Sequence, residues 1–437
     1  MKERDNKMGR CENAIFKKEM KKTHTILIPQ MLQPHFTLLC ETLKMEGYKT
    51  ELLTDDSADV AQTGLKYVHN DICYPAILVI GQFIKALQSG KYDTEKTALL
   101  ITQTGGGCRA SNYIFLLRKA LKNAGFERVP VISLNFAGLD KSGFTLSPNT
   151  LLKIVYAVLY GDAILALYNQ ARSYEKMCGA AKKALESSVS YIVNQLRGNR
   201  ELFFKKHVKY ITKLFAEIEL SKEEKPRVGI VGEIYLKYSP LGNNNLEDFL
   251  ISQGAEPVCG GLCDFLLYCL ANGFVTEKLY NMKLKFKWAQ KMAIDFLIRK
   301  QKAINKITEK YSTFNPMHTF DMLLGCTEGI IDKGVKMGEG WLLTAEMIAH
   351  IKEGVGNIIC AQPFGCLPNH IVAKGVVSSI RAKYPLANIA PIDYDSGACR
   401  VNQENRIKLM LMNAQSNMEK HIRIKREESR SGDKVTV

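Results

Sequence analysis

Short apolar segments alternate with helix-like segments in two separate stretches of this chain, residues 23–150 and 226–418. In the first stretch the strand-like and helix-like segments follow in the order 26–29, 38–45, 50–53, 74–87, 97–101, 112–123 and 129–136. Alternation of this kind is typical of a parallel, doubly wound sheet. The sequence therefore predicts an α/β fold with two parallel-sheet lobes and substantial helical segments.

The same pattern divides the chain into units. We expect a flexible lead-in (1–22), a first α/β domain (23–150), a helical segment (151–225), a second α/β domain with a helical insertion (226–418) and a basic disordered tail (419–437). Within the helical segment only 189–193 offers a candidate strand. The tail is expected to be disordered because its composition provides little apolar surface to bury.

Composition places the chain among soluble globular proteins. Of its 437 residues 46% are hydrophobic, and we find no apolar run of the roughly 18 residues that a membrane span requires. The first residues are charged and lack the apolar core of a secretory signal. The 12 cysteines are scattered, which favours reduced thiols and metal ligation over disulfides. These features predict a cytoplasmic protein that does not enter a membrane.

Half of the net charge of +16 comes from one stretch, residues 278–310, in which ten basic residues face only Asp295 and Glu309. Its basic residues are Lys278, Lys283, Lys285, Lys287, Lys291, Arg299, Lys300, Lys302, Lys306 and Lys310. Apolar residues recur between them at roughly helical spacing, namely Leu279, Met282, Phe286, Ala289, Ala293 and Phe296. The simplest interpretation is the solvated face of an amphipathic helix. Alternatives are a docking face for an acidic redox partner or a surface that steers CoA-like anions. We expect no nucleic-acid partner, because no recognisable binding module is present.

Three cysteines occupy similar loops, with Cys73 in HNDICYP, Cys108 in TGGGCRASNY and Cys366 in QPFGCLPNH. Each precedes a helix-like segment, where free backbone N–H groups favour a thiolate or a bound anionic cluster. Three thiolates that meet at one point suit an iron–sulfur cluster better than structural zinc, which usually has four ligands. On a four-iron cluster, three ligands leave one iron open for chemistry. Because the three loops lie far apart in sequence, only the fold can bring them together.

The loop before Cys108 is the most distinctive of the three. Gly105, Gly106 and Gly107 allow tight backbone geometry and close approach to a bulky ligand, and Arg109 follows the thiol. We therefore expect these four residues to contact the cofactor. Neither a phosphate-binding P-loop nor a GxGxxG dinucleotide fingerprint fits this loop. A structural glycine turn beside a buried thiol remains the alternative.

The segment GEIYLKYSPLGNNNLEDFL, residues 232–250, follows a predicted strand and is rich in polar residues. Such strand-to-helix loops often bind ligands. The candidate substrate contacts are Glu233, Tyr235, Asn243, Asn244 and Asn245. The alternative is an ordinary helix start at which the asparagines act as caps. No catalytic residue is assigned by the sequence.

Five segments, HNDICYP, TQTGGGCRASNY, VGEIYLKYSPLGNNNLEDFL, GEGWLLTAEM and QPFGCLPNHIVAKG, extend from about residue 69 to 375. Together they resemble blocks of the 2-hydroxyacyl-CoA dehydratase and benzoyl-CoA reductase superfamily. The branch they resemble most is described as acyl-CoA dehydratase activase-related. The resemblance implies flavodoxin-like (Rossmann-like) lobes and a [4Fe-4S] cluster held by three cysteines per subunit, which map onto Cys73, Cys108 and Cys366.

The resemblance also implies a function and a partner. A separate iron–sulfur ATPase, the activator, would deliver low-potential electrons, so that ATP acts only through that partner. The substrate would be an acyl-CoA and the reaction a lyase-type radical dehydration, or a reduction, in an anaerobic cytoplasm. Dimers are expected. The absence of an ATPase signature in this chain agrees with a recipient of electrons.

Two alternatives stay open. A related branch carries an [8Fe-9S] double-cubane cluster, reduces small molecules and needs more cysteine ligands, for which this chain offers Cys259, Cys263, Cys326, Cys360 and Cys399. Cys259 and Cys263 lie in CGGLC, a spacing that would also allow a structural metal. The other alternative is a non-catalytic electron-transfer or cluster-carrying partner of an activator.

Overall fold

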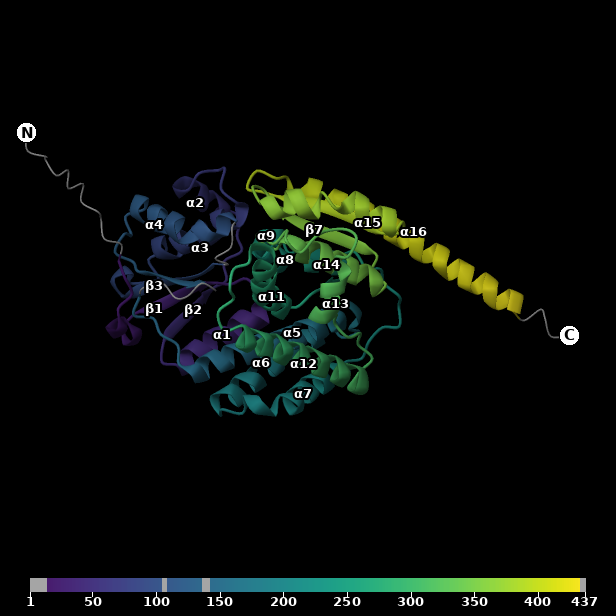
Figure 1. The fold of residues 1–437 in the computed structure, drawn as a ribbon, viewed down its shortest axis with the longest axis horizontal. Coiled ribbons are helices and arrows are strands. Elements are labelled where there is room, and N and C mark those ends of the chain that lie inside the picture. The colour runs from purple at the N-terminus through teal and green to yellow at the C-terminus, as the bar shows by residue number, and fades with distance from the viewer. Residues whose placement is uncertain (1–13, 104–107, 136–141, 433–437) are drawn as a thin grey trace, which may run out of the picture.

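The computed structural model describes residues 14–103, 108–135 and 142–432 (Figure 1). Two four-stranded sheets form its framework, and every strand pair in both sheets is parallel. The prediction of an α/β fold with two parallel-sheet lobes is therefore confirmed. The strands carry near-continuous apolar runs because helices cover both faces of each sheet.

The first sheet has the strand order β2-β1-β3-β4. Its strands are β1 (Thr25–Pro29), β2 (Lys49–Leu53), β3 (Thr97–Gln103) and β4 (Val131–Asn135). The helices between them are α1 (Gln33–Met45), α2 (Asp59–Tyr67), α3 (Tyr74–Gln88) and α4 (Tyr113–Asn123). The direction of winding reverses between β1 and β3, and ligands of doubly wound sheets bind outside the carboxyl ends of the strands at such a point.

The second sheet repeats this topology with the order β6-β5-β7-β8. Its strands are β5 (Arg227–Gly232), β6 (Glu256–Cys259), β7 (Asn357–Pro363) and β8 (Asn388–Tyr394). Around them lie α8 (Ile234–Tyr238), α9 (Pro240–Asn243), α10 (Leu246–Ser252), a π-helix (Asn369–Ala373), α15 (Val377–Lys383) and α16 (Arg400–Gly432). The topological switch of this lobe lies between β5 and β7.

The remaining helices are α5 (Pro148–Tyr174), α6 (Ala180–Arg197), α7 (Phe204–Ala216), α11 (Leu262–Tyr280), α12 (Lys287–Tyr311), α13 (Phe320–Cys326) and α14 (Gly340–Lys352). Of these, α5, α6, α7 and α12 form a layer beneath the two lobes, whereas α14 packs against β5 and β7 of the second lobe (Figure 1). The central helix α5 packs against α1 of the first lobe and β6 of the second. In α5 the carboxylate of Asp162 lies 2.7 Å from His35 Nε2 in α1 and accepts the backbone N–H groups of Leu262 and Cys263 at the start of α11. This one side chain thus joins both halves of the molecule.

The helix α5 is long and apolar enough to cross a membrane, so the expectation that the chain has no such run is wrong. However, 72% of its most apolar 18-residue window is buried inside the protein. Burial of that extent is what a core helix of a soluble protein shows.

The structure differs from the expected local features of these units at three places. The lead-in is attached from residue 14 onward, because Phe16 is fully buried against Tyr48 and Phe144. The candidate strand 189–193 lies within α6, where apolar residues at helical spacing bury one face. The segment predicted as a disordered tail continues α16 as far as Gly432. Its many Lys, Arg and Glu residues are good helix formers and extend a helix that is already nucleated.

The basic stretch 278–310 is not one amphipathic helix. A connection at 281–286 separates α11 from α12, and Leu279, Met282 and Phe286 are exposed rather than buried. The buried face of α12 is instead formed by Leu297, Gln301, Ile304 and Thr308, at helical spacing. Part of its basic face, with Lys302 and Lys306, lines an open groove against α7. The pattern therefore predicted a helix but misplaced its start and its apolar side.

Candidate functional site

The three cysteines singled out by the sequence line the same cavity between the two lobes. Cys73 is the residue immediately before α3, and Cys108 immediately precedes a short 3-10 turn (Arg109–Asn112) that leads into α4. Cys366 lies between β7 and the π-helix. Each thiol therefore stands at the start of a helix or turn, as expected. The fold brings together three loops that the sequence keeps apart.

Direct contacts hold these loops against one another. The backbone N–H of Tyr74 donates to the carbonyl of Phe364 at 3.2 Å, which joins the Cys73 loop to the Cys366 loop. Arg109 Nη1 donates to the carbonyl of Asp71 at 2.5 Å, which joins the Cys108 loop to the Cys73 loop. Gly365 has a φ of +74° and lies where an added Cβ would be 3.4 Å from Cys73 Cα. Glycine permits both this left-handed conformation and the close approach.

The thiols are buried in surroundings that disfavour a bare thiolate. Cys73 and Cys366 have exposed fractions of 5% and 7%. Burial, followed by the nearby charge of Glu233, raises the pKa of the Cys73 thiol to about 12. Burial and the charge of Glu339 raise the pKa of Cys366 as well. Burial therefore disfavours a bare thiolate at both positions.

Polar side chains accompany two of the sulfur atoms. The hydroxyl of Tyr113 lies 3.0 Å from Cys73 Sγ, and Asn369 Nδ2 donates to Cys366 Sγ at 3.2 Å. Hydrogen bonds of this kind to cysteine sulfur tune the reduction potential of an iron–sulfur cluster.

Two carboxyl groups, Glu233 and Glu339, lie in the wall beside the cysteines. Glu233 follows β5 and accepts the backbone N–H of Leu236 at 2.9 Å, while Glu339 precedes α14 and accepts that of Ile234 at 3.2 Å. Burial, and then the proximity of Glu339, raises the pKa of Glu233 to about 8. Burial raises the pKa of Glu339 too. Two like charges in a buried wall resist simultaneous ionisation, so one carboxyl group retains a proton near neutral pH.

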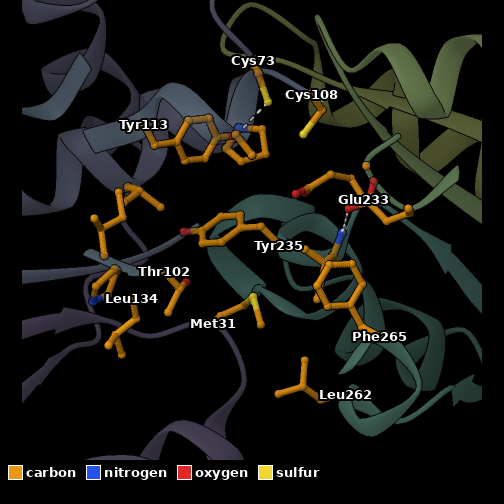
Figure 2. Close-up of a pocket in the computed structure, with 18 of the residues that line it drawn as sticks. Met31, Cys73, Thr102, Cys108, Tyr113, Leu134, Glu233, Tyr235, Leu262 and Phe265 are labelled. Atoms are coloured by element: carbon orange, nitrogen blue, oxygen red, sulfur yellow. Dashed lines mark hydrogen bonds between the residues drawn. The ribbon is translucent and has the colours of Figure 1, made fainter. Parts of the chain in front are cut away.

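The cavity has a volume of about 330 Å³, and its thiol-bearing end opens into a mainly apolar hollow. Figure 2 shows Cys73 and Cys108 at one end, and Met31, Leu134 and Leu262 toward the other. This apolar part lies beyond the carboxyl ends of β1, β3 and β4, where doubly wound sheets bind their ligands. Its size falls in the range of ligand pockets.

Tyr235 extends across the cavity (Figure 2). Its side chain is buried, with 7% exposed, and its hydroxyl has no hydrogen-bond partner among the described residues. Buried hydroxyl groups are nearly always paired, so an unpaired one that points into a cavity marks a position for a ligand atom. Tyr235 thus lines the cavity, and its contact with a substrate stays a prediction.

The predicted asparagines lie elsewhere. Asn243 donates to the carbonyl of Leu236 and accepts the N–H of Leu246, and Asn244 donates to Gln403. Asn244 and Asn245 both adopt left-handed backbone conformations with φ near 57° and 58°. None of the three is among the described residues that line the cavity. Asn243 therefore fits the helix-capping alternative, whereas the side chain of Asn245 makes no capping hydrogen bond. The predicted cofactor contacts Gly105, Gly106 and Gly107 lie outside the described residues.

The other cysteines do not join this end of the cavity. Cys40 lines the apolar part from α1, and its thiol contacts Thr50 Oγ1 at 3.0 Å. The cysteines considered for a larger cluster or a second metal, namely Cys259, Cys263, Cys326, Cys360 and Cys399, are absent from the described cavity lining. Among the described residues the thiol-bearing end thus offers three sulfur ligands. No described cysteine forms a disulfide.

Sequence reasoning missed Tyr113 and Glu339 as site residues. Both lie within segments that carried the family resemblance, TQTGGGCRASNY and GEGWLLTAEM. These residues approach the cysteines only because the two lobes pack together. The spacing of residues in the sequence does not predict such contacts. The chain matches no protein-family model, and a comparison with curated proteins finds no match. The function must therefore be argued from the site itself.

Proposed function

We propose that this protein binds an iron–sulfur cluster, in its simplest form [4Fe-4S], through Cys73, Cys108 and Cys366. It would use low-potential electrons to dehydrate or reduce an acyl-CoA thioester, in the manner of the 2-hydroxyacyl-CoA dehydratases. One observation carries the proposal: three cysteines from separate loops line one cavity between the two lobes. Thiol redox catalysis would not require that convergence.

The donor set fits such a cluster. Soft sulfur ligands select iron–sulfur clusters or zinc, and three ligands are one fewer than a structural zinc site usually has. The raised thiol pKa values show that the apoprotein provides little to stabilise a thiolate there. Arg109, the basic residue in the described cavity lining, donates to Asp71 instead. Cationic iron would supply the missing partner.

The rest of the cavity supports a substrate site. When bound, the cluster would supply a low-potential electron and an iron position open to a substrate oxygen. The apolar walls would hold an acyl chain and exclude water, and Tyr235 would orient a polar atom through its unpaired hydroxyl. The carboxyl pair Glu233 and Glu339 would hold a proton beside the reacting group and donate it to a departing hydroxyl.

These features favour an enzyme over the two alternatives. An electron carrier has no need of an apolar hollow that leads away from its cluster. A double cubane would need further sulfur ligands at the thiol-bearing end, and the described lining offers none beyond the three. The electron donor is proposed to be a separate ATP-driven iron–sulfur activator.

The decisive experiment is the iron and acid-labile sulfide content per chain after anaerobic purification, together with EPR spectroscopy of the reduced protein. We expect about four of each per chain. About eight irons would instead support the double cubane and the reduction of small molecules. No iron after anaerobic reconstitution would overturn the proposal.

A further inference from the structure

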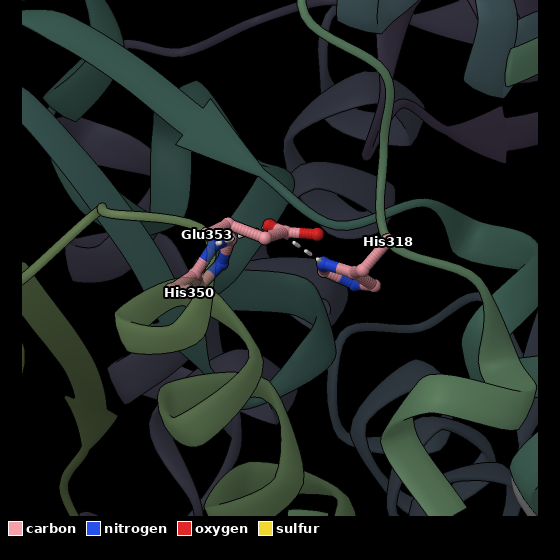
Figure 3. A group of neighbouring side chains, drawn as sticks. All are labelled: His318, His350 and Glu353. Carbon is pink, nitrogen blue, oxygen red and sulfur yellow. Dashed lines mark ion pairs between the residues drawn. The ribbon is translucent and has the colours of Figure 1, made fainter.

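A second group of metal-binding side chains lies at the far end of α14. Glu339, before this helix, lines the cavity, whereas His350 and Glu353 belong to its last turn and cap. A helix of 13 residues is about 20 Å long, which separates the two places. The third member, His318, comes from the segment between α12 and α13. Figure 3 shows the Glu353 side chain reaching from the last turn of the helix toward the ring of His318.

The distances within this group fit a tetrahedral metal. Glu353 Oε2 lies 3.6 Å from His318 Nδ1 and 4.0 Å from His350 Nδ1. One ligand atom from each of the three residues lies within 4.8 Å of those of the other two. Zinc bonds of about 2.1 Å in tetrahedral geometry place neighbouring ligand atoms roughly 3.4 Å apart. Small side-chain shifts would therefore complete the site.

An unpaired imidazole provides an independent indication of a ligand. The side chain of His350 is 1% exposed, and neither ring nitrogen has a hydrogen-bond partner within the described part of the chain. Leaving such a group buried without a partner is costly, so native structures rarely do it. The ring is also held in place, because an added Cβ at Gly229 in β5 would lie 2.9 Å from its Cδ2 atom.

The carboxylate of Asp264 lies beside His318 and would not bind the metal itself. Asp264 Oδ2 lies 3.2 Å from His318 Nε2, on the opposite side of the ring from Glu353. The other oxygen of Asp264 accepts a hydrogen bond from Gln301 at 2.7 Å. A carboxylate that orients a histidine from its far nitrogen is the usual companion of a metal-binding imidazole. Neither the metal ligands nor this companion overlap with the cysteine site.

We propose that His318, His350 and Glu353 bind a Zn²⁺ ion, with Asp264 as a positioning residue and water as the fourth ligand. Two imidazoles and one carboxylate match zinc better than magnesium or calcium, which prefer oxygen ligands. A hollow of about 30 Å³ beside the group leaves room for one water molecule. The ion would fasten the C-terminal end of α14 to the segment before α13. This proposal does not depend on the proposed function.

The experiment compares zinc content and zinc affinity in full-length variants. Each protein is stripped with a chelator, titrated with Zn²⁺ against a competing indicator, and analysed by elemental mass spectrometry. We expect about one Zn²⁺ per chain in the wild type and in the Cys73→Ser variant, and loss of that ion in Glu353→Gln and His350→Gln. Asp264→Asn should weaken zinc binding about 10- to 100-fold. His24→Gln serves as the matched histidine control.

Either of two results would overturn the proposal. One is a wild-type chain that takes up no equivalent of zinc. The other is zinc that is lost in Cys73→Ser but retained in Glu353→Gln, which would place the ion among the thiols. Zinc should also raise the melting temperature of the wild type but not that of Glu353→Gln. The Glu353 side chain is 25% exposed, so this variant remains informative if His350→Gln fails to fold.

Discussion

The hydroxyl of Tyr113 lies 3.0 Å from the sulfur of Cys73, although 40 residues separate them in the chain. Tyr113 begins α4, directly after the 3-10 turn that follows Cys108. One short segment therefore provides a thiol of its own and a hydrogen-bonding partner for the thiol of another loop. This contact links the two loops directly at the sulfur atom of Cys73.

Replacing Tyr113 with Phe should leave a cluster in place but lower its reduction potential. Hydrogen bonds to cysteine sulfur stabilise the more negative, reduced state, so their removal disfavours reduction. A bond worth about 1 kcal/mol corresponds to tens of millivolts. An EPR-monitored redox titration measures the shift. Tyr92→Phe, at a tyrosine whose hydroxyl bonds Glu51 instead, is the control. An unchanged potential would mean that the contact is only structural.

Cys108→Ser and Cys366→Ser should each reduce the iron content to near zero while the chain stays folded. Serine keeps the size of the side chain but is a poor ligand for iron. Iron analysis with circular dichroism separates loss of the cluster from loss of the fold. Cys326→Ser is the control, because Cys326 in α13 is buried like Cys366 but lies outside the described cavity lining. Full iron content in the Cys108 variant would refute the ligand assignment.

Glu233→Gln should flatten the pH dependence of apoprotein stability. Burial raises the pKa of Glu233 from 4.5 to about 8 in the folded chain. Its protonated form therefore contributes stability below about pH 4.5, and this contribution is lost as the pH rises through about 8. Above that pH the variant should exceed the wild type by on the order of 1 kcal/mol, since it buries no charge.

Urea unfolding at several pH values tests this expectation. The exposed Glu219→Gln should follow the wild type throughout, because that side chain is 76% exposed. If Glu233→Gln and the wild type lose stability in parallel between pH 5 and about 9, Glu233 does not hold the proton we assign to it.

Asp162→Ala should be strongly destabilising. The substitution leaves His35 and the backbone N–H groups of Leu262 and Cys263 without their acceptor in a buried region. Removing one partner of such a buried group costs about 3–5 kcal/mol. Chemical denaturation measures the loss. Asp248→Ala, at a side chain that is 67% exposed, should cost no more than about 1 kcal/mol. Equal effects would show that Asp162 does not join the lobes.

Most strands and helices were predictable because their signals are local. The apolar runs at 26–29 and 97–101 become β1 and β3 with nearly the same bounds. Pro75 lies in the first turn of α3 and Gly254 just beyond the end of α10, positions at which these residue types are common. The secondary structure was predicted wrongly where tertiary contacts, rather than local sequence, determine it. The stretch 189–193 has strand-like composition, but the surrounding residues bury it as one face of α6.

By itself the sequence determined two alternating α/β stretches and the placement of Cys73, Cys108 and Cys366 before helices or turns, because chain neighbours set those features. Only the tertiary structure decided that the three loops meet at one cavity. It also decided that Glu339 faces Glu233 and that His318 approaches Glu353. Such meetings depend on how the lobes and the helical layer pack. Packing brings residues into contact that are hundreds of positions apart in the chain. Local sequence patterns do not predict these contacts.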